Sequence, residues 1–521
     1  MSSQIKKVKN KSKSKDRNKK TSKDIPKHKF EGVVEDDVSN NTKNSNTNNT
    51  NNIIKNTQID IPKENIPIIV ELPNININIF ETNNSVKFST NLDYPRSEYG
   101  FHHFIHNNKN KTEKLKVFEG KKKVYLVFNR FEKSVDNYEK SINVLSKKLF
   151  STINPNSKLE IIDDGFFKLW EILMLFNLID INKEKFNSLH LAEKTGSFIQ
   201  SCIYFRDMYC KKNISKNDKF YDMSIKHDGT NNTKDSKNEL DEIFTKHYKN
   251  EKPQRFVKQS GGKSKNTHMD ITNPKFLKLV GGQLEEKVDL ITGNCQFDWT
   301  DENINTQEQE SFRLLIAEIT ACVKFQKKGG NFVCKFFETF TKTSLKIVSV
   351  LMSLYDKIYW IKPLSSELYN SEKYAVCMGF KFSDKDKEYK EISKKMEEIM
   401  KSLHNDKINK VVDIFLDFEI PKILVRSMIE LNKETSNQQL KNIGEIISFV
   451  EKEVYSGDEY HDKREEQIKG STFWSDTFLP DSENLNTKKN IRDKILESAL
   501  SVSNKEIEKL NKLLVHVENQ H

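Results

Sequence analysis

The segment GGNFVCKFFETFT, which runs from Gly329 to Thr341, decides the fold of this chain. Two glycines release the chain into a run of β-forming residues over 331–337, and this run predicts a strand. Lys335 lies in the middle of these apolar residues. Burying a lysine there is costly unless its charge is paired or the amine is neutral. The pattern leaves two interpretations open: a functional lysine, or an edge-strand lysine whose ammonium reaches water.

A second strand-like segment, NSEKYAVCMGF, occupies residues 370–380 and follows a KP pair. Together the two segments resemble the FtsJ-like 2′-O-ribose methyltransferases, and most closely their cap-specific mRNA branch in eukaryotes and viruses. In that family a GG-x-F-[IV]-x-K strand carries a catalytic lysine, and a KP…NSE-[RK]-Y-x-V-C segment carries a glutamate. The resemblance covers residues 165–382 and assigns these catalytic roles to Lys335 and Glu372.

The resemblance implies an α/β domain over residues 151–385, with a Rossmann-like methyltransferase sheet and helices on both of its faces. Residues 1–60 form a Lys/Asn-rich tail that is expected to be disordered. Residues 61–150 mix strand-like and helix-like patterns and predict an N-terminal α+β extension. Residues 211–266 are of low complexity and predict a surface insertion. Residues 386–521 have helical spacing and alternating charge, which predicts a helical C-terminal region.

The formal net charge of +11 is concentrated in the tail, because residues 1–30 hold 12 Lys/Arg and only 2 Asp/Glu. Such a tail favours polyanions such as RNA, although a solubilising or localising tail has the same composition. The chain shows no membrane-spanning apolar run and no signal peptide. Its six cysteines form no C-x-x-C pair and no zinc spacing, so no metal is expected. These features predict an intracellular, cytoplasmic protein, and the viral character of the resemblance suggests a viral factory or virion.

The segment 163–179 predicts a helix with a dense apolar face, and Lys168 lies beside that face. A lysine in this position is ordinarily a solvated helix residue. In the family, however, a lysine on the helix before the first strand begins the catalytic tetrad, and Lys168 matches that place. A neutral lysine can take the proton of a ribose hydroxyl, and a second ammonium nearby favours the neutral form. The resemblance therefore implies Lys335 as the base, with Lys168 beside it and Glu372 orienting the pair.

Residues 187–205 follow the order strand, tight turn and helix, which suits the amino-acid end of S-adenosylmethionine. Gly196 would allow a close backbone approach, and Ser197 could open the helix. The family usually shows an acidic or small residue followed by A-P-G-[GSA]-F. This chain has Glu193, a Lys-Thr pair, Gly196, Ser197 and Phe198. The resemblance thus implies S-adenosylmethionine as the cofactor and these four residues as its contacts, although the Ala-Pro pair is missing.

Two further positions are cofactor candidates by resemblance. Asp270, in the DIT-x-P pattern, matches a segment that contacts the cofactor's adenosine in cap methyltransferases, and its alternative is an Asx-turn or helix cap. Asn294, within the predicted strand and loop at 287–299, occupies the place of the family's catalytic aspartate. Asn294 is therefore a candidate for both catalysis and cofactor binding. An amide can hold geometry by hydrogen bonding, but it carries no charge.

The remaining periodicity predicts further local structure. The expected elements are strands over 74–80, 122–131 and 220–226, and helices over 134–150, 311–328, 409–431, 436–455 and 488–516. Residues 93–111 hold aromatic residues and three histidines. This cluster could stack on a base or cap, or it could be a packed connector.

Three functions are compatible with these observations. The first is a 2′-O-methyltransferase that uses S-adenosylmethionine and acts on RNA, namely capped mRNA near its 5′ end. The second is a catalytically degenerate RNA-binding or scaffold protein, which Asn294 and the altered cofactor loop would explain. The third is 2′-O-methylation of ribosomal or transfer RNA. Capping-enzyme or polymerase partners are left open by the sequence.

Overall fold

The structure is a computed structural model that describes residues 61–96, 99–111, 161–193, 195–211, 214–223, 255–258, 270–282, 284–294, 304–452 and 457–518. The chain divides into two units, and all of the described residues belong to the second, Ile59–His521. The strand predicted at 122–131, the helix predicted at 134–150 and the tail at 1–60 lie outside the described residues.

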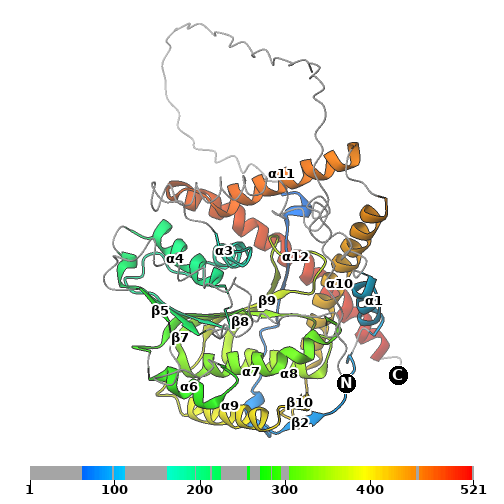
Figure 1. Cartoon of the computed structure of the whole chain (residues 1–521). Coiled ribbons are helices and arrows are strands. Elements are labelled where there is room, and N and C mark those ends of the chain that lie inside the picture. Colours follow the sequence, from blue (N-terminus) through cyan, green and yellow to red (C-terminus); the bar gives the residue numbers. More distant parts are fainter. Residues whose placement is uncertain are drawn as a thin grey trace, which may run out of the picture. The chain divides into compact units, whose positions relative to one another are not determined.

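An eight-stranded sheet forms the centre of the described chain (Figure 1). Its order is β1-β8-β9-β7-β6-β3-β4-β5, and the five strands from β7 to β5 pair in parallel. β9 runs antiparallel to β7 and β8, and β1 runs antiparallel to β8. The strands are β1 (Ile68–Glu71), β3 (Asn187–Leu191), β4 (Lys219–Met223), β5 (Phe256–Lys258), β6 (Val288–Gly293), β7 (Gln326–Phe336), β8 (Tyr355–Lys362) and β9 (Lys373–Phe380). This sheet confirms the predicted α/β, Rossmann-like fold.

The order of the strands reverses beside β3. From β3 the chain moves outward through β4 to β5, and then returns to the other side of β3 as β6. Ligands of open parallel sheets bind outside the carboxyl ends of the strands at such a reversal. The carboxyl ends of β3 and β6, at Leu191 and Gly293, therefore mark the position where a ligand site is expected.

Helices cover both faces of the sheet, as Figure 1 shows. One face carries α3 (Gly165–Phe176), α4 (Ser197–Tyr209), α11 (Asp458–Phe478) and α12 (Leu485–Glu518). The other face carries α6 (Pro274–Gly281), α7 (Gln307–Phe325), α8 (Lys342–Leu354) and α9 (Lys387–Asn405). Two buried apolar clusters result, one on each face, because each helix turns its apolar stripe toward the strands. The helices α1 (Tyr99–Lys111) and α10 (Lys422–Glu451) pack against each other.

The strand predicted over residues 74–80 is wrong. Pairing stops after β1, because Pro73 has no amide hydrogen with which to extend the ladder. The Asn78 side chain then accepts a hydrogen bond from the Phe80 amide and opens a short 3-10 helix at Ile79–Glu81. The alternation in this stretch therefore reflects apolar side chains that an irregular segment buries in the core.

The helix predicted over residues 409–431 is wrong in its first half. Lys410–Ile414 forms β10, which pairs antiparallel with β2 (Val86–Ser89) in a separate two-stranded sheet. The helix α10 begins only at Lys422, directly after Pro421. Apolar residues with mixed spacing are compatible with a helix or a strand. Here the strand forms because its pairing partner β2, more than 300 residues away in the sequence, is available.

Other boundaries were predicted more closely. The helix predicted at 311–328 is α7, which ends at Phe325 because Gln326 already begins β7. The strand predicted at 220–226 is β4, and the helix predicted at 488–516 lies within α12. The strand β5 lies inside the low-complexity segment and was not predicted, nor was α11.

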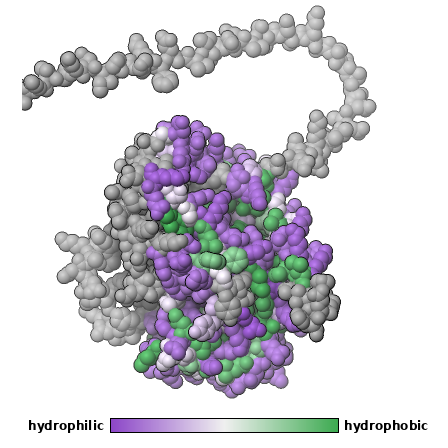
Figure 2. Space-filling view, turned by 90° about the vertical axis from the view of Figure 1, so that its right-hand side faces the viewer, coloured by the Kyte–Doolittle hydropathy of each residue, from purple (hydrophilic) through white to green (hydrophobic). Residues whose placement is uncertain are grey.

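One face of the described chain is mostly polar. Figure 2 shows a face on which hydrophilic side chains predominate and apolar areas are small, in agreement with the mean hydropathy of −0.72. Among the described residues, no helix has the length and apolar character needed to cross a membrane.

Candidate active site

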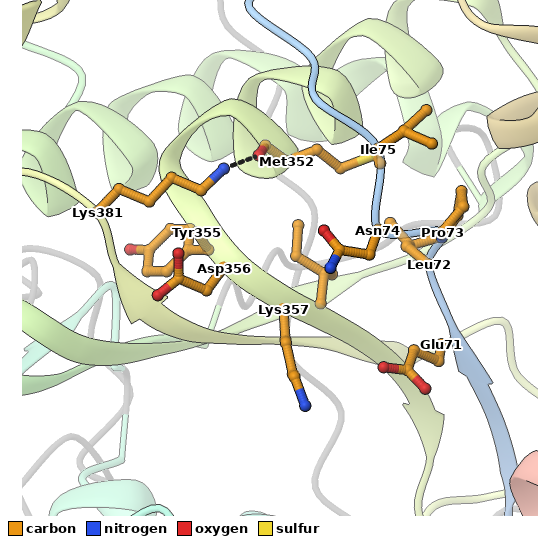
Figure 3. A pocket seen from close by; sticks show the side chains of 11 residues that line it. Glu71, Leu72, Pro73, Asn74, Ile75, Met352, Tyr355, Asp356, Lys357 and Lys381 are labelled. Carbon is orange, nitrogen blue, oxygen red and sulfur yellow. Dashed lines mark hydrogen bonds between the residues drawn. The ribbon is translucent and has the colours of Figure 1, made fainter.

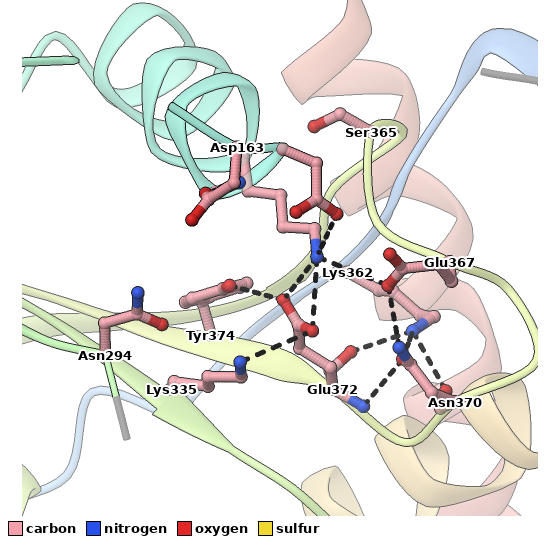
Figure 4. Close-up of polar contacts among 12 residues, drawn as sticks. Asp163, Asn294, Lys335, Lys362, Ser365, Glu367, Asn370, Glu372 and Tyr374 are labelled. Atoms are coloured by element: carbon pink, nitrogen blue, oxygen red, sulfur yellow. Dashed lines mark hydrogen bonds and ion pairs between the residues drawn. The ribbon is translucent and has the colours of Figure 1, made fainter. Parts of the chain in front are cut away.

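Two lysines from distant parts of the sequence share one carboxylate. Lys168 projects from α3 and reaches Glu372, which directly precedes β9. Lys335 projects from β7 and reaches the same carboxylate (Figure 4). The Lys168 Nζ lies 3.3 Å from Glu372 Oε1, and the Lys335 Nζ lies 3.6 Å from Glu372 Oε2. The structure therefore brings together three of the four residues predicted as catalytic.

Strand register places this cluster. Lys335 of β7 lies opposite Tyr374 of β9, and the Tyr374 hydroxyl donates a hydrogen bond to Glu372. The strand that carries Lys335, β7, lies between β6 and β9 in the sheet. Lys335 is therefore not an edge-strand lysine. Lys168 is only 5% exposed, so it is not a solvated helix residue either.

Carboxylates surround the Lys168 ammonium. Besides Glu372, its Nζ lies 2.9 Å from Asp164 Oδ2 and 3.2 Å from Glu367 Oε2. Burial alone would lower the pKa of Lys168, but Glu367, Glu372 and Asp164 together raise it well above the ordinary value. These contacts favour the charged form of Lys168. Glu367 was not predicted as a site residue.

The same contacts set the ionisation of the acids. Burial alone would raise the pKa of Glu372, but Lys168 and Lys335 lower it to about 2. Burial raises the pKa of Glu367 to about 7, although the Lys168 ammonium acts in the opposite direction and lowers it. Burial also lowers the pKa of Lys362 to about 7, and its ammonium donates to the carbonyls of Asn370 and Glu372 at 3.0 and 2.8 Å.

A second polar cluster lies at the carboxyl ends of β3 and β6. Glu193 Oε1 accepts hydrogen bonds from the Gly196 amide at 3.2 Å, the Ser197 hydroxyl at 3.3 Å and Asn294 Nδ2 at 3.4 Å. Gly196 has φ +92°, a left-handed conformation that glycine adopts without strain. Four of the predicted cofactor residues thus meet at the strand reversal.

The other oxygen of Glu193 is buried and unpaired. Glu193 is 1% exposed, and its Oε2 has no hydrogen-bond partner among the described residues. Burial, followed by the nearby Asp163 carboxylate, raises the pKa of Glu193 to about 8, and Asp222 adds to the shift. A buried carboxyl oxygen of this kind is suited to a cationic group. Asp222 was not predicted, although an acidic residue at the end of the second parallel strand is a recognisable signal.

Asn294 has a structural role in this cluster. Its backbone amide donates to the Leu191 carbonyl at 3.2 Å and so joins the ends of β6 and β3. Its side-chain amide donates to Glu193, whereas an aspartate in the same place would face that carboxyl with a second negative charge. The contacts recorded for Asn294 are therefore with the Glu193 cluster.

The other two predicted cofactor residues have different surroundings. Phe198 is fully buried, and its ring centroid lies 6.1 Å from that of Tyr374, so it packs between the two polar clusters. Asp270 Oδ1 accepts hydrogen bonds from the amide and hydroxyl of Thr272 at 2.9 and 2.6 Å. This arrangement is the Asx-turn that was the alternative interpretation of Asp270.

A shallow pocket elsewhere contains none of the predicted residues (Figure 3). It lies near the start of β8, whereas Lys335 pairs with Tyr374 of β9, which lies opposite Ile361 near the other end of β8. Asp356, Lys357 and Lys381 line it, and the Lys381 ammonium donates to the Met352 carbonyl at 2.8 Å. The pocket is therefore distinct from the candidate active site.

Comparisons with known proteins agree with the geometry. The model of the FtsJ-like methyltransferases matches residues 163–380. Cap-specific mRNA (nucleoside-2′-O-)-methyltransferase 2 of Drosophila melanogaster is 26% identical over 274 residues, which are 51% of this chain and 36% of that protein. Cap-specific mRNA (nucleoside-2′-O-)-methyltransferase 1 of Trypanosoma cruzi is 34% identical over 102 residues, which are 20% of this chain and 28% of that protein. The chain thus spans about a third of the length of these relatives. Residues 163–380 are thus similar to the FtsJ-like methyltransferase family.

Proposed function

We propose that this chain transfers a methyl group from S-adenosylmethionine to a ribose 2′-OH near the 5′ end of capped mRNA. The observation that carries the proposal is the pair Lys168 and Lys335 on one carboxylate, Glu372, in a domain similar to the FtsJ-like family. The relatives named as cap-specific mRNA methyltransferases support capped mRNA as the substrate.

The chemistry requires a base. S-adenosylmethionine supplies a methyl group on a sulfonium, so that a C–O bond forms as the C–S bond breaks, and the hydroxyl must lose its proton. In this proposal the neutral amine of Lys335 takes that proton. Lys168 stays charged, because three carboxylates hold its ammonium. Glu372 fixes the separation of the two nitrogens, which holds the base in one position.

The residues around Glu193 fit the cofactor. The unpaired, buried Glu193 Oε2 is an acceptor suited to the ammonium of an amino acid. The first amides of α4, at Ser197 and beyond, are donors suited to its carboxylate. Asp222, at the end of β4, is placed to accept from a ribose.

We expect cofactor binding to depend on pH through Glu193. The carboxyl has a pKa of about 8 in the free protein, so it is mostly protonated at neutral pH and must lose a proton to pair with an ammonium. The affinity for S-adenosylmethionine should therefore rise about tenfold from pH 6 to pH 7. Titration calorimetry at both pH values measures this, and Glu193→Gln should remove the dependence. Equal affinities of the parent protein at both pH values would contradict the assignment of Glu193.

The substrate is tested by methyl transfer to matched RNAs. We expect incorporation into a capped RNA, at least tenfold less into the same RNA without a cap, and none into a transfer RNA. Equal transfer to capped and uncapped RNA would contradict capped mRNA as the specific substrate and would favour 2′-O-methylation of another RNA. Cofactor binding without any transfer would instead support the scaffold function that Asn294 had suggested.

A further inference from the structure

The loop between β8 and β9 is held by helices that follow the family domain. This loop, residues 363–372, carries Glu367 and Glu372, which both contact the Lys168 ammonium. Its first turn is bound by Glu171, a fully buried residue of α3. The carboxylate of Glu171 accepts from the Leu364 amide at 2.7 Å and from the Ser365 amide at 3.1 Å.

Glu171 is itself oriented from the C-terminal region. The Trp474 indole, on α11, donates to Glu171 Oε2 at 2.9 Å. The same ring packs edge-to-face on Phe167, with 5.4 Å between the centroids. A second C-terminal helix binds the other part of the loop, because Gln439 Nε2 on α10 donates to the Tyr369 carbonyl at 3.0 Å. Two helices outside residues 163–380 thus hold the loop at two points.

The geometry connects these contacts to the candidate catalytic lysines. Glu171 lies one turn after Lys168 on the same helix, so a single rigid element carries both the anchor of the loop and the cation that the loop contacts. A loop that moved away from Glu171 would carry Glu367 away from Lys168. Two partners of that ammonium would remain: Asp164, which is about half exposed, and Glu372 at the very end of the loop, where the Tyr374 hydroxyl holds its carboxylate.

We propose that Trp474 and Gln439 are positioning residues of the active site, which hold the 363–372 loop so that Glu367 stays on the Lys168 ammonium. This inference rests on the proposed function, since it assigns the C-terminal helices to the same reaction. It extends the active site beyond the family domain and makes α10 and α11 part of the catalytic unit.

The test uses the full chain with Trp474→Phe and Gln439→Ala. Phenylalanine keeps an aromatic ring against Phe167 but removes the indole donor. Asn437→Ala is the matched control, because Asn437 is an exposed residue of the same helix as Gln439. We expect amide hydrogen exchange of Leu364 and Ser365 to become about tenfold faster in Trp474→Phe, and exchange of the loop amides to rise in Gln439→Ala, with no change in the control.

Activity provides the second readout. In each variant kcat should fall about tenfold, while the affinity for S-adenosylmethionine stays unchanged, because the Glu193 cluster is untouched. The decisive comparison repeats both substitutions in a Glu367→Gln background. If the helices act through Glu367, the further loss of kcat disappears there, whereas a general loss of stability gives additive effects.

Additive effects on kcat would overturn the inference. Unchanged loop exchange in both variants would also overturn it, and this result is independent of whether the parent protein methylates RNA. If Trp474→Phe does not fold, Gln439→Ala decides by the same two measurements. A parent protein that binds the cofactor but transfers no methyl group would count against the proposed function alone.

Discussion

Substitution of Lys335 by alanine will remove methyl transfer and leave cofactor binding intact. The substitution deletes the amine that takes the hydroxyl proton in our proposal, and a general base contributes roughly 10²–10⁴-fold to the rate. The Glu193 cluster lies at the ends of β3 and β6, where Gly196 and Asn294 hold the Glu193 carboxyl, and it should keep its affinity for S-adenosylmethionine. Transfer to capped RNA under single-turnover conditions and calorimetric titration of the cofactor measure the two effects.

The substitution Lys335→Arg distinguishes the role of the positive charge at this position from the role of Lys335 as a base. A guanidinium can keep the ion pair with Glu372, but it stays protonated and cannot accept a proton. We therefore expect the arginine variant to be as inactive as the alanine variant. Lys357→Ala is the matched control, since Lys357 is an exposed lysine near the start of β8. Substantial activity in Lys335→Arg would contradict the role of Lys335 as the base.

Substitution of Glu372 by glutamine will destabilise the fold in a pH-dependent way. The amide leaves Lys335 without its ion-pair partner and leaves Lys168 with only Asp164 and Glu367. The pKa of Glu372 falls from its ordinary value of 4.5 to about 2 in the folded protein. The ionised group therefore contributes stability above pH 4.5, and this stability is lost as the pH falls toward 2. The shift corresponds to about 3 kcal/mol.

Urea unfolding at pH 7, 5 and 3 measures this contribution. We expect Glu372→Gln to lose about 3 kcal/mol at pH 7 and pH 5, and we expect the difference from the parent protein to shrink at pH 3. Glu445→Gln is the control, because Glu445 forms a surface ion pair of 3.9 Å with Lys441 and its substitution should change stability by less than about 1 kcal/mol. A pH-independent loss in Glu372→Gln would show that packing, not charge, is responsible.

Much of the fold follows from local pattern. The strand of Lys335, the strand–turn–helix around Gly196 and the helix of Lys168 each lie in one continuous stretch, where periodicity and glycine placement are informative. The strand β10 was predicted as a helix, and β1 was not predicted, because each pairs with a segment far away in the sequence. Their residues fit several local structures, and only the distant partner selects one.

The sequence by itself determined the resemblance to the FtsJ-like methyltransferases, the α/β class and the candidate residues Lys168, Lys335 and Glu372, because those residues lie inside motifs with fixed spacing. Only the tertiary structure decided that Lys168 is a buried cation, that Glu367 contacts it, and that Trp474 reaches Glu171. These properties depend on burial and on distances between charges. Both are set by how separate helices and strands pack, and neither produces a recognisable pattern in the sequence.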